Sequence, residues 1–143
     1  MSEKIEVVRR LFEAVERRDL QALLDCYDPE VQIVEPASLP YGGTYRGHDG
    51  ARRHVAAFLT CWGPLQSPAE YPLGAQFCDG PGDTVVALFR HRARDPRTDE
   101  RLDEPELSVY AVRGGKVVRS QMFHADVGAV TEFLRRSHAS LAG

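Results

Sequence analysis

The chain has 143 residues, of which 43% are hydrophobic and 27% charged, a length and balance typical of one soluble globular domain. Its net charge of −3 excludes the strongly basic surface with which proteins bind DNA or RNA. No apolar run approaches the roughly 20 residues that a membrane-spanning helix needs. The start of the chain also lacks the basic and then apolar plan of a secretory signal. We therefore expect one domain over residues 1–143 that acts on neither nucleic acid nor membrane.

The cysteine and histidine patterns give no indication of a metal site or a cofactor. The three cysteines are an odd number without CxxC spacing, which favours a reducing, cytoplasmic location over a disulfide or a zinc site. No HxH or HExxH motif and no glycine-rich phosphate loop occurs. Chemistry without a metal or a cofactor is the expectation.

Hydrophobic spacing predicts two helices at the start of the chain. Apolar side chains recur at helical intervals over residues 3–17, and Asp19 is placed to cap a short second helix. Asp28-Pro29 ends that helix, because proline cannot continue the hydrogen-bond ladder. Residues 31–35 are expected to form a short strand that turns alternate side chains, Glu35 among them, to one face.

A third helix is predicted after a loop. Residues 36–47 are rich in proline, glycine and tyrosine, which is typical of a loop. Asp49 is a suitable N-cap for the helix that follows, and Gly63-Pro64 ends it. Its apolar residues form a single stripe, made of Ala51, Val55, Phe58, Leu59 and Trp62.

The second half of the chain is predicted to form a meander of strands followed by a helix. Gly114-Gly115 lies between two β-branched runs and is the strongest hairpin signal. A charged loop is expected over residues 95–104, and Asp126 can cap a terminal helix. The strands are placed over residues 73–78, 84–94, 106–113 and 116–124.

This order of elements predicts an α+β fold. About four helices would pack on a long, curved antiparallel sheet and form a cone, which leaves an apolar pocket where helices and sheet diverge. Cavities of this kind are usual sites for small ligands.

Five segments in order resemble the SnoaL-like branch of the nuclear transport factor 2-like superfamily. They are Arg18-Asp19-Leu20, Tyr27–Val31, Tyr45–Gly50, Gly114–Val118 and Phe123–Asp126. The resemblance implies a single domain with the cone fold and a homodimer formed through the open face of the sheet. It does not imply one activity, because the family includes polyketide cyclases, isomerases, dehydratases, epoxide hydrolases and non-catalytic members.

Comparison with ketosteroid isomerase, a member of this superfamily, singles out Glu35. Glu35-Pro36 stands where the isomerase carries its general-base aspartate. Leu11 and Ser108 stand where the isomerase has its two oxyanion donors, so true ketosteroid isomerase activity is not expected. Asp126 matches an aspartate that SnoaL-type cyclases carry just after the last strand.

We name four candidate catalytic residues, of which Glu35 and His124 come first. Strand alternation would place Glu35 in the pocket, where it could take a proton from a carbon next to a carbonyl. The alternative is a carboxylate at the solvent rim. His124 alternates with Met122 on the last strand and could act as an acid, a base or an oxyanion donor. Its alternative is a core histidine held by a backbone carbonyl.

The other two catalytic candidates are Asp126 and Tyr110. Asp126 is either the catalytic acid that the resemblance implies or a plain helix N-cap. Tyr110 shares a strand face with Ser108 and Glu106, so its hydroxyl could enter the cavity as a donor, although it could also face outward.

Seven further residues are candidates for substrate binding. Tyr41 and Tyr45 could form the mouth, and Trp62 is either a stacking surface or simply core. His48, His54 and His138 are expected at the surface or near helix caps, without chemistry. The substrate-binding set is Tyr41, Tyr45, Phe58, Trp62, His91, Ser108 and Met122.

The leading hypothesis is a cofactor-independent acid/base enzyme for a small apolar, oxygenated molecule such as a polyketide-like or terpenoid compound. Cyclisation, isomerisation and dehydration share a first proton transfer, so they remain open. The rival hypothesis is a non-catalytic module for ligand binding or dimerisation. Convergence of Glu35 and His124, within ~3 Å or through one water, would favour the enzyme, whereas separate surroundings would remove its mechanism.

Overall fold

The computed structural model describes residues 2–142 and contains four α-helices, two short 3-10 helices and six strands. The helices are α1 (Glu3–Arg17), α2 (Leu20–Cys26), α3 (Gly47–Trp62) and α4 (Val127–Ala142), with η1 (Gly63–Leu65) and η2 (Pro68–Glu70) after α3. The strands are β1 (Tyr27–Glu35), β2 (Gly43–Arg46), β3 (Gln76–Asp79), β4 (Thr84–Arg94), β5 (Arg101–Arg113) and β6 (Lys116–His124). None of the described helices is long and apolar enough to cross a membrane.

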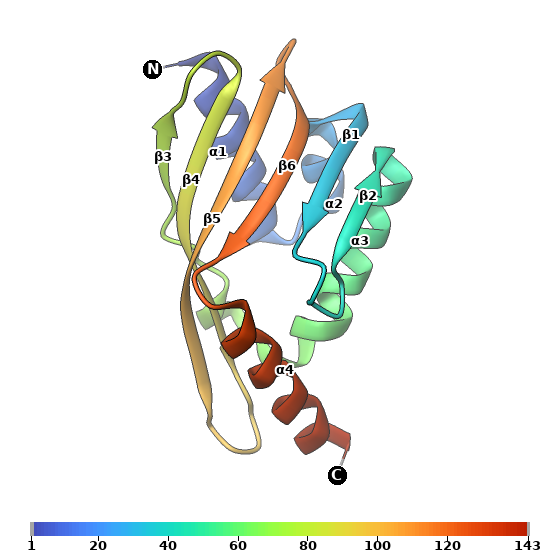
Figure 1. Cartoon of the computed structure of the whole chain (residues 1–143), viewed down its shortest axis with the longest axis vertical. Coiled ribbons are helices and arrows are strands. Elements are labelled where there is room, and N and C mark those ends of the chain that lie inside the picture. The colour runs from blue at the N-terminus through green and yellow to red at the C-terminus, as the bar shows by residue number, and fades with distance from the viewer. Residues whose placement is uncertain (1, 143) are drawn as a thin grey trace.

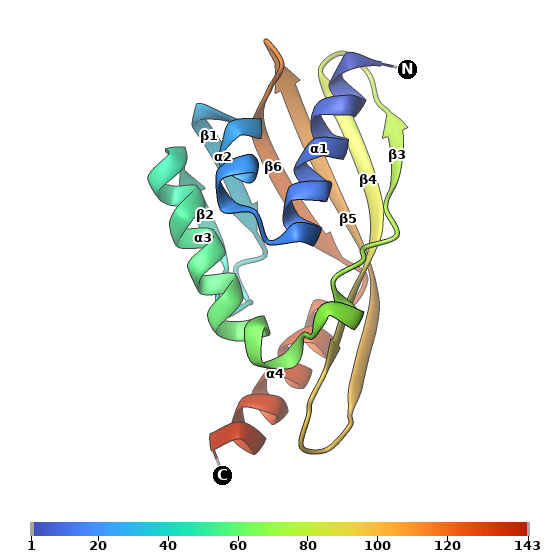
Figure 2. The same ribbon diagram turned by 180° about the vertical axis from the view of Figure 1, so that it is seen from behind.

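The six strands form one curved sheet in the order β2-β1-β6-β5-β4-β3. Neighbouring strands run antiparallel except β1 and β6, which run parallel, so the sheet is mixed rather than wholly antiparallel as predicted. Helices α1, α2 and α3 cover one face of the sheet, and α4 lies at its far end beside the tip of the β4–β5 hairpin (Figure 1; Figure 2). The predicted α+β cone is confirmed.

The caps of the first two helices confirm the pattern predicted for the start of the chain. The Ser2 hydroxyl accepts a hydrogen bond from the Ile5 N–H and begins α1. Arg18 ends α1 in the left-handed conformation, and the Asp19 carboxylate accepts from the Ala22 N–H to begin α2. The two helices therefore meet at a tight corner above the sheet.

Three expected boundaries are wrong because pairing in the sheet overrides local composition. The loop predicted over residues 36–47 contains β2, since Gly43 adopts a φ of 116° and pairs with Glu35. Strand β1 already begins at Tyr27, and Pro29 lies where its ladder to β6 is interrupted. The first strand of the predicted meander, expected over residues 73–78, is shorter and begins later, at Gln76–Asp79.

The charged segment 95–104 and the start of α3 also differ from expectation. Strand β5 begins at Arg101 because its polar first residues pair with β4, where Arg90 and Asp103 form an ion pair of 2.6 Å. In α3 the helix begins at Gly47, so Asp49 lies in the first turn and pairs with Arg52 instead of capping. The charge of these residues predicts that they are exposed, but it does not predict their backbone conformation.

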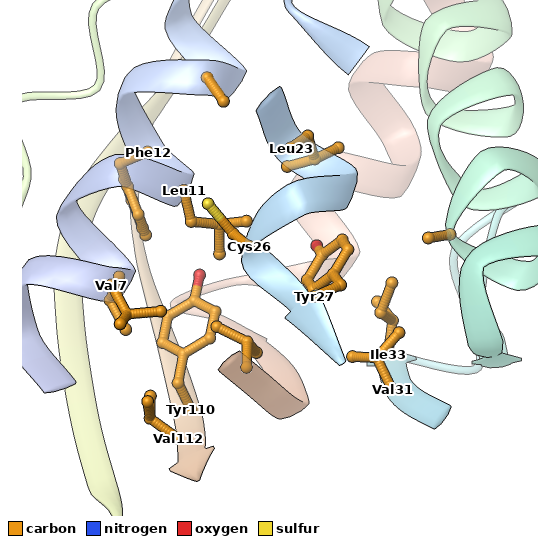
Figure 3. Packing of buried hydrophobic residues seen from close by; sticks show 14 of the residues in the cluster. Val7, Leu11, Phe12, Leu23, Cys26, Tyr27, Val31, Ile33, Tyr110 and Val112 are labelled. Carbon is orange, nitrogen blue, oxygen red and sulfur yellow. The ribbon is translucent and has the colours of Figure 1, made fainter. Parts of the chain in front are cut away.

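Two hydrophobic clusters hold the fold together. The larger cluster packs α1 and α2 on the inner face of the sheet, where Leu11 and Phe12 face Tyr110 of β5 (Figure 3). Leu23 of α2 and Ile33 of β1 belong to the same cluster. The smaller cluster joins the end of α3 to α4 around Trp62, Phe133 and Leu134. Between the clusters, the helices and the sheet diverge.

Candidate functional site

A cavity of about 270 Å³ lies between helices α1 to α3 and the inner face of the sheet. The helices supply most of its apolar wall, with Leu11, Phe12, Leu23, Val55 and Phe58 among the lining residues. The strands supply its polar wall. The polar residues that line it from the strands are Glu35 of β1, His91 of β4, Glu106, Ser108 and Tyr110 of β5, and Ser120 of β6. A ligand in this cavity would therefore have an apolar side and a polar side.

Glu35 is the last residue of β1 and lies buried in the cavity wall. Its Oε2 accepts a hydrogen bond of 2.7 Å from His54 Nε2, while its Oε1 is buried without a hydrogen-bond partner. The His54 imidazole is held in turn by the Tyr45 ring, 5.1 Å away in an edge-on arrangement. Glu35 is thus fixed on one oxygen and free on the other.

Sequence reasoning missed His54, which was expected at the surface without chemistry. His54 comes from α3, three residues after Ala51 and four before Phe58, and both spacings place it on the buried side of the helix. This spacing was the signal that could have found it, because a histidine on the apolar stripe of a cavity helix must meet a polar partner.

Glu106 is a second carboxyl group in the cavity, and its pKa is raised. Burial raises the pKa of Glu106 to about 8, with the negative charges of Glu35 and Glu104 adding to the shift and His124 opposing it. Glu106 therefore keeps its proton at neutral pH and can donate a hydrogen bond. It was named only as a neighbour of Tyr110, although strand alternation places both on the inner face.

His124 lies behind Glu106 rather than in the cavity wall. Its Nδ1 donates to Glu104 Oε2 at 3.0 Å, and its Nε2 lies 3.4 Å from Glu106 Oε1. Burial alone would lower the pKa of His124, but the Glu104 hydrogen bond and the surrounding carboxylates raise it overall. Glu104 also accepts from the Asp126 N–H. The three side chains form a buried chain, Glu104–His124–Glu106.

The convergence of Glu35 and His124 that would favour the enzyme is absent: no hydrogen bond joins them, and each is bound to a different partner. The mechanism that pairs these two residues is therefore wrong. The cause is the register of β5 and β6, which places His124 directly opposite Glu106. Asp126 also lies outside the cavity wall, where its Oδ1 accepts from the Ala129 N–H at 2.9 Å. It caps α4, as the structural alternative for this residue anticipated.

Tyr110, Ser108 and Met122 line the cavity, as expected for them from strand alternation. The Tyr110 phenol is buried, which raises its pKa, and the hydroxyls of Ser108 and Ser120 lie close enough to lower it in part. Tyr110 therefore stays neutral and can donate a hydrogen bond. The Ser120 hydroxyl also contacts the Met122 sulfur at 3.3 Å.

The aromatic candidates divide between cavity and core. Phe58 lines the cavity, whereas Tyr41, Tyr45 and Trp62 do not. Trp62 Nε1 donates to the Tyr41 hydroxyl at 2.9 Å inside the smaller cluster, and the Tyr45 hydroxyl donates to the Tyr41 carbonyl. These three residues join α3 to the loop before it, and Tyr41 and Tyr45 do not form the expected mouth because they do not line the cavity.

His91 lines the cavity from β4 and is 3% exposed. Its ring lies 4.1 Å from that of Trp62 and 5.9 Å from that of Phe58, edge-on to both. Burial lowers the pKa of His91 to about 3, and the charges of His124 and Arg18 act in the same direction, so its imidazole is neutral. Its Nε2 has no hydrogen-bond partner.

Within residues 2–142 no group of three or more potential ligand side chains is placed to hold a metal ion. The chemistry that the cavity can perform itself is proton transfer. It combines a carboxyl group with one free oxygen, a protonated carboxyl group and neutral hydroxyl and imidazole groups on one apolar chamber.

Comparison with known proteins gives the family. The model of the SnoaL-like domain matches residues 8–120. The chain belongs to the SnoaL-like family. Uncharacterized proteins of Mycobacterium tuberculosis and Mycobacterium bovis are 30% identical to it over 132 residues, which cover 90% of this chain and 94% of theirs.

Solved structures support the fold of this SnoaL-like protein. TerC, co-crystallized with polyporic acid, superposes with a TM-score of 0.79 at 24% identity and covers 94% of this chain and 99% of its own. An NTF2-like protein of unknown function from Burkholderia pseudomallei gives the same TM-score at 22% identity, with coverages of 94% and 98%. At these identities the likeness concerns the fold alone.

Proposed function

We propose that this SnoaL-like protein is a cofactor-independent acid/base enzyme that enolises a small, apolar, carbonyl-containing molecule. Glu35 is the base, and Glu106 is the acid that holds the carbonyl oxygen. The observation that supports this proposal most is that two carboxyl groups line one cavity in different surroundings. Glu35 is hydrogen-bonded to His54, whereas burial raises the pKa of Glu106. Such a pair separates the roles of base and acid.

The proton transfer uses the free oxygen of Glu35. Oε1 takes the proton from the carbon next to the carbonyl, while His54 keeps hold of Oε2 and fixes the orientation of the carboxylate. The electron pair of the broken C–H bond moves to the carbonyl oxygen, which accepts a hydrogen bond from protonated Glu106. Tyr110 is a second neutral donor on the same wall.

The buried chain behind Glu106 supports its role as acid. If Glu106 passes its proton to the enolate oxygen, the charge that results on its carboxylate faces His124 Nε2 at 3.4 Å. His124 is itself oriented by Glu104, so the chain stabilises the negative charge on Glu106 without solvent. His124 is thus a positioning residue that acts through Glu106.

The enol or enolate is the branch point of the reaction. Return of the proton to a different carbon gives isomerisation, loss of an oxygen substituent gives dehydration, and attack on a second carbonyl gives cyclisation. That TerC, which shares the fold, was co-crystallized with polyporic acid supports a small organic molecule as the ligand class.

Exchange of α-protons for deuterium tests this function without knowledge of the final product. Small ketones are incubated with the protein in D2O, and the loss of the α-proton signal is followed by ¹H NMR. We expect catalysed exchange in the wild type, its loss in Glu35→Gln, and no change in Glu13→Gln, which removes an exposed carboxylate of α1. Equal exchange in wild type and Glu35→Gln would contradict the proposal, and binding without exchange would favour the non-catalytic module.

The outer face of the sheet supports the homodimer that the resemblance implies, and we propose that face as the interface. Leu88, Leu107 and Phe123 lie opposite one another on β4, β5 and β6, and Leu88 and Phe123 are 40% and 45% exposed. Sedimentation equilibrium should give a dimer for the wild type and a monomer for Phe123→Lys. A wild-type monomer would contradict this.

A further inference from the structure

His91 is a buried titratable group that the proposed proton transfer does not use. It lies in the cavity wall, neutral, with Nε2 unpartnered, and the rings of Trp62 and Phe58 hold its imidazole edge-on from two sides. Such a ring is already oriented before a ligand binds. A buried polar atom without a partner is unfavourable, so a ligand group that hydrogen-bonds it gains more than it would elsewhere on the wall.

A hydroxyl is the ligand group that suits this nitrogen. A neutral imidazole carries a proton on one nitrogen only, so Nε2 is a donor in one tautomer and an acceptor in the other. A hydroxyl both donates and accepts, and therefore pairs with either tautomer. A charged group is a poorer match, because the side chains packed against the imidazole are the uncharged rings of Trp62 and Phe58.

The volume of the cavity limits the size of the ligand. About 270 Å³ is below the range of about 300–1,000 Å³ that is usual for drug-sized ligands. A cavity of this size suits one ring or two fused rings with small substituents better than a four-ring skeleton.

The two walls fix how such a ligand lies. Its ring system would pack on the apolar side chains of α1, α2 and α3, and its oxygens would face the strands. His91 pairs with Glu104 on β5, and Phe89, next but one along β4, pairs with Glu106, so His91 and Glu106 are diagonal neighbours in the wall of the cavity. A ligand with two oxygens can therefore meet both.

We propose that the cavity takes a one- or two-ring ketone that carries a hydroxyl group, and that His91 recognises this hydroxyl through Nε2. The ketone part rests on the proposed function, whereas the ring number and the hydroxyl rest on the cavity and on His91. His91 is then a specificity-determining residue: it selects among ketones that Glu35 and Glu106 would otherwise treat alike.

Calorimetric titration with matched ketones tests the proposal. The probes are 2-tetralone, its four isomers with a hydroxyl on the aromatic ring, and the four-ring ketone androstenedione. In the wild type, at least one hydroxytetralone should bind about tenfold more tightly than 2-tetralone, because a site built for a hydroxyl rejects the analogue without it. Androstenedione should bind more weakly than that isomer.

Two variants assign the preference to the imidazole. His91→Phe keeps a flat ring without polar atoms, and it should bind the preferred isomer and 2-tetralone equally well within about twofold. His91→Leu, which has a smaller side chain, should also bind the two ketones equally well, and thermal unfolding shows which of the two variants is folded. If neither variant folds, the proposal is judged by whether the wild type prefers a hydroxytetralone to 2-tetralone.

Several results would overturn the proposal. They are no binding of any tetralone, no preference for any hydroxytetralone in the wild type, survival of the preference in a folded His91 variant, or tighter binding of androstenedione. Failure of the enzymatic function gives a different result: the preferred hydroxytetralone binds through His91 and its α-protons do not exchange. Exchange of androstenedione alone would keep the function and refute the ligand class.

Discussion

The two carboxyl groups of the cavity each lie beside a histidine, but the two histidines differ in their partners and in their exposure. His54 binds Glu35 at 2.7 Å, has no carboxylate behind it, and is 12% exposed at its side chain. His124 lies 3.4 Å from Glu106, is held from behind by Glu104, and is only 2% exposed. The first pair leaves one carboxyl oxygen free for a substrate. In the second pair, burial keeps a proton on Glu106 although the neighbouring His124 opposes this shift of its pKa.

This difference teaches that the strand register, more than the kind of residue, separates base from acid. Glu35 ends β1 where α3 delivers an imidazole to it. Glu106 lies in the middle of β5, surrounded by buried groups and close to two other carboxyl groups. The same side chain in two surroundings is thereby suited to opposite halves of one proton transfer.

The largest expected effect separates the two carboxyl groups by their pH profiles. Glu35→Gln and Glu106→Gln should each lower the rate of α-proton exchange by about 10²–10⁴-fold, as is usual for loss of a general acid or base. The wild-type rate should fall above pH about 8, where Glu106 loses its proton. Residual exchange in Glu106→Gln should lack that fall, as measured by NMR across the pH range. Persistence of the fall in this variant would assign it to another group.

Replacement of the two histidines compares their structural roles. His124→Phe leaves the buried carboxylate of Glu104 without its partner, and loss of one member of a buried charge pair costs about 3–5 kcal/mol of stability. His54→Phe should destabilise less, because His54 is more exposed and binds a single carboxylate. Urea unfolding at pH 7 measures both. Equal losses would show that the two pairs are energetically alike.

The pH dependence of stability isolates Glu106. Its pKa of about 8 in the folded protein lies above the ordinary value of 4.5, so the folded state holds a proton that the unfolded chain has released. This contribution to stability is complete below pH 4.5 and is lost as the pH rises through 8. The slope reaches at most about 1.4 kcal/mol per pH unit.

The variant Glu106→Gln cannot bind this proton, so comparison with the wild type isolates the effect of Glu106 on stability. Urea unfolding between pH 6 and 8.5 should show a wild-type free energy of unfolding that falls with pH more steeply than that of the variant. Glu106 also contributes to the raised pKa of His124, so the difference between the two proteins reports Glu106 together with its effect on His124. Parallel curves would refute a protonated Glu106.

Asp126 gives the smallest expected effect. Asp126→Ala removes the oxygen that accepts from the Ala129 N–H and should lower stability by about 1 kcal/mol. The exchange rate per folded molecule should stay at the wild-type value, because the carboxylate lies outside the cavity wall. Loss of exchange with unchanged stability would instead favour the catalytic role that the resemblance implies.

The sequence predicts the fold well because the fold depends on local signals. The apolar stripes, the caps at Asp19 and Asp126 and the glycine hairpin each act within a few residues, and together they order the elements correctly. Strand β2 and the first residues of β5 escaped prediction because only a partner strand makes them extended.

The sequence predicts only part of the site, because some of its contacts join residues that are far apart in the chain. Alternation along β1 placed Glu35 on the inner face, but it left open whether Tyr110 and His91 point inward or outward, and the structure shows both in the cavity wall. The pairing of His54 with Glu35 depends on the contact between α3 and β1, which spacing within α3 indicates but does not identify. His124 was expected beside Glu35 because the register of β5 and β6 cannot be read from either strand alone.

The central claim is that one of the two cavity carboxyl groups is protonated at neutral pH. A ¹³C NMR titration of the glutamate side-chain carboxyl carbons tests it most directly, with Glu106→Gln as the assignment. The account predicts one resonance in the wild type with a midpoint near pH 8 that is missing from the variant. Ionisation of every glutamate by about pH 5, as in unperturbed side chains, would contradict it.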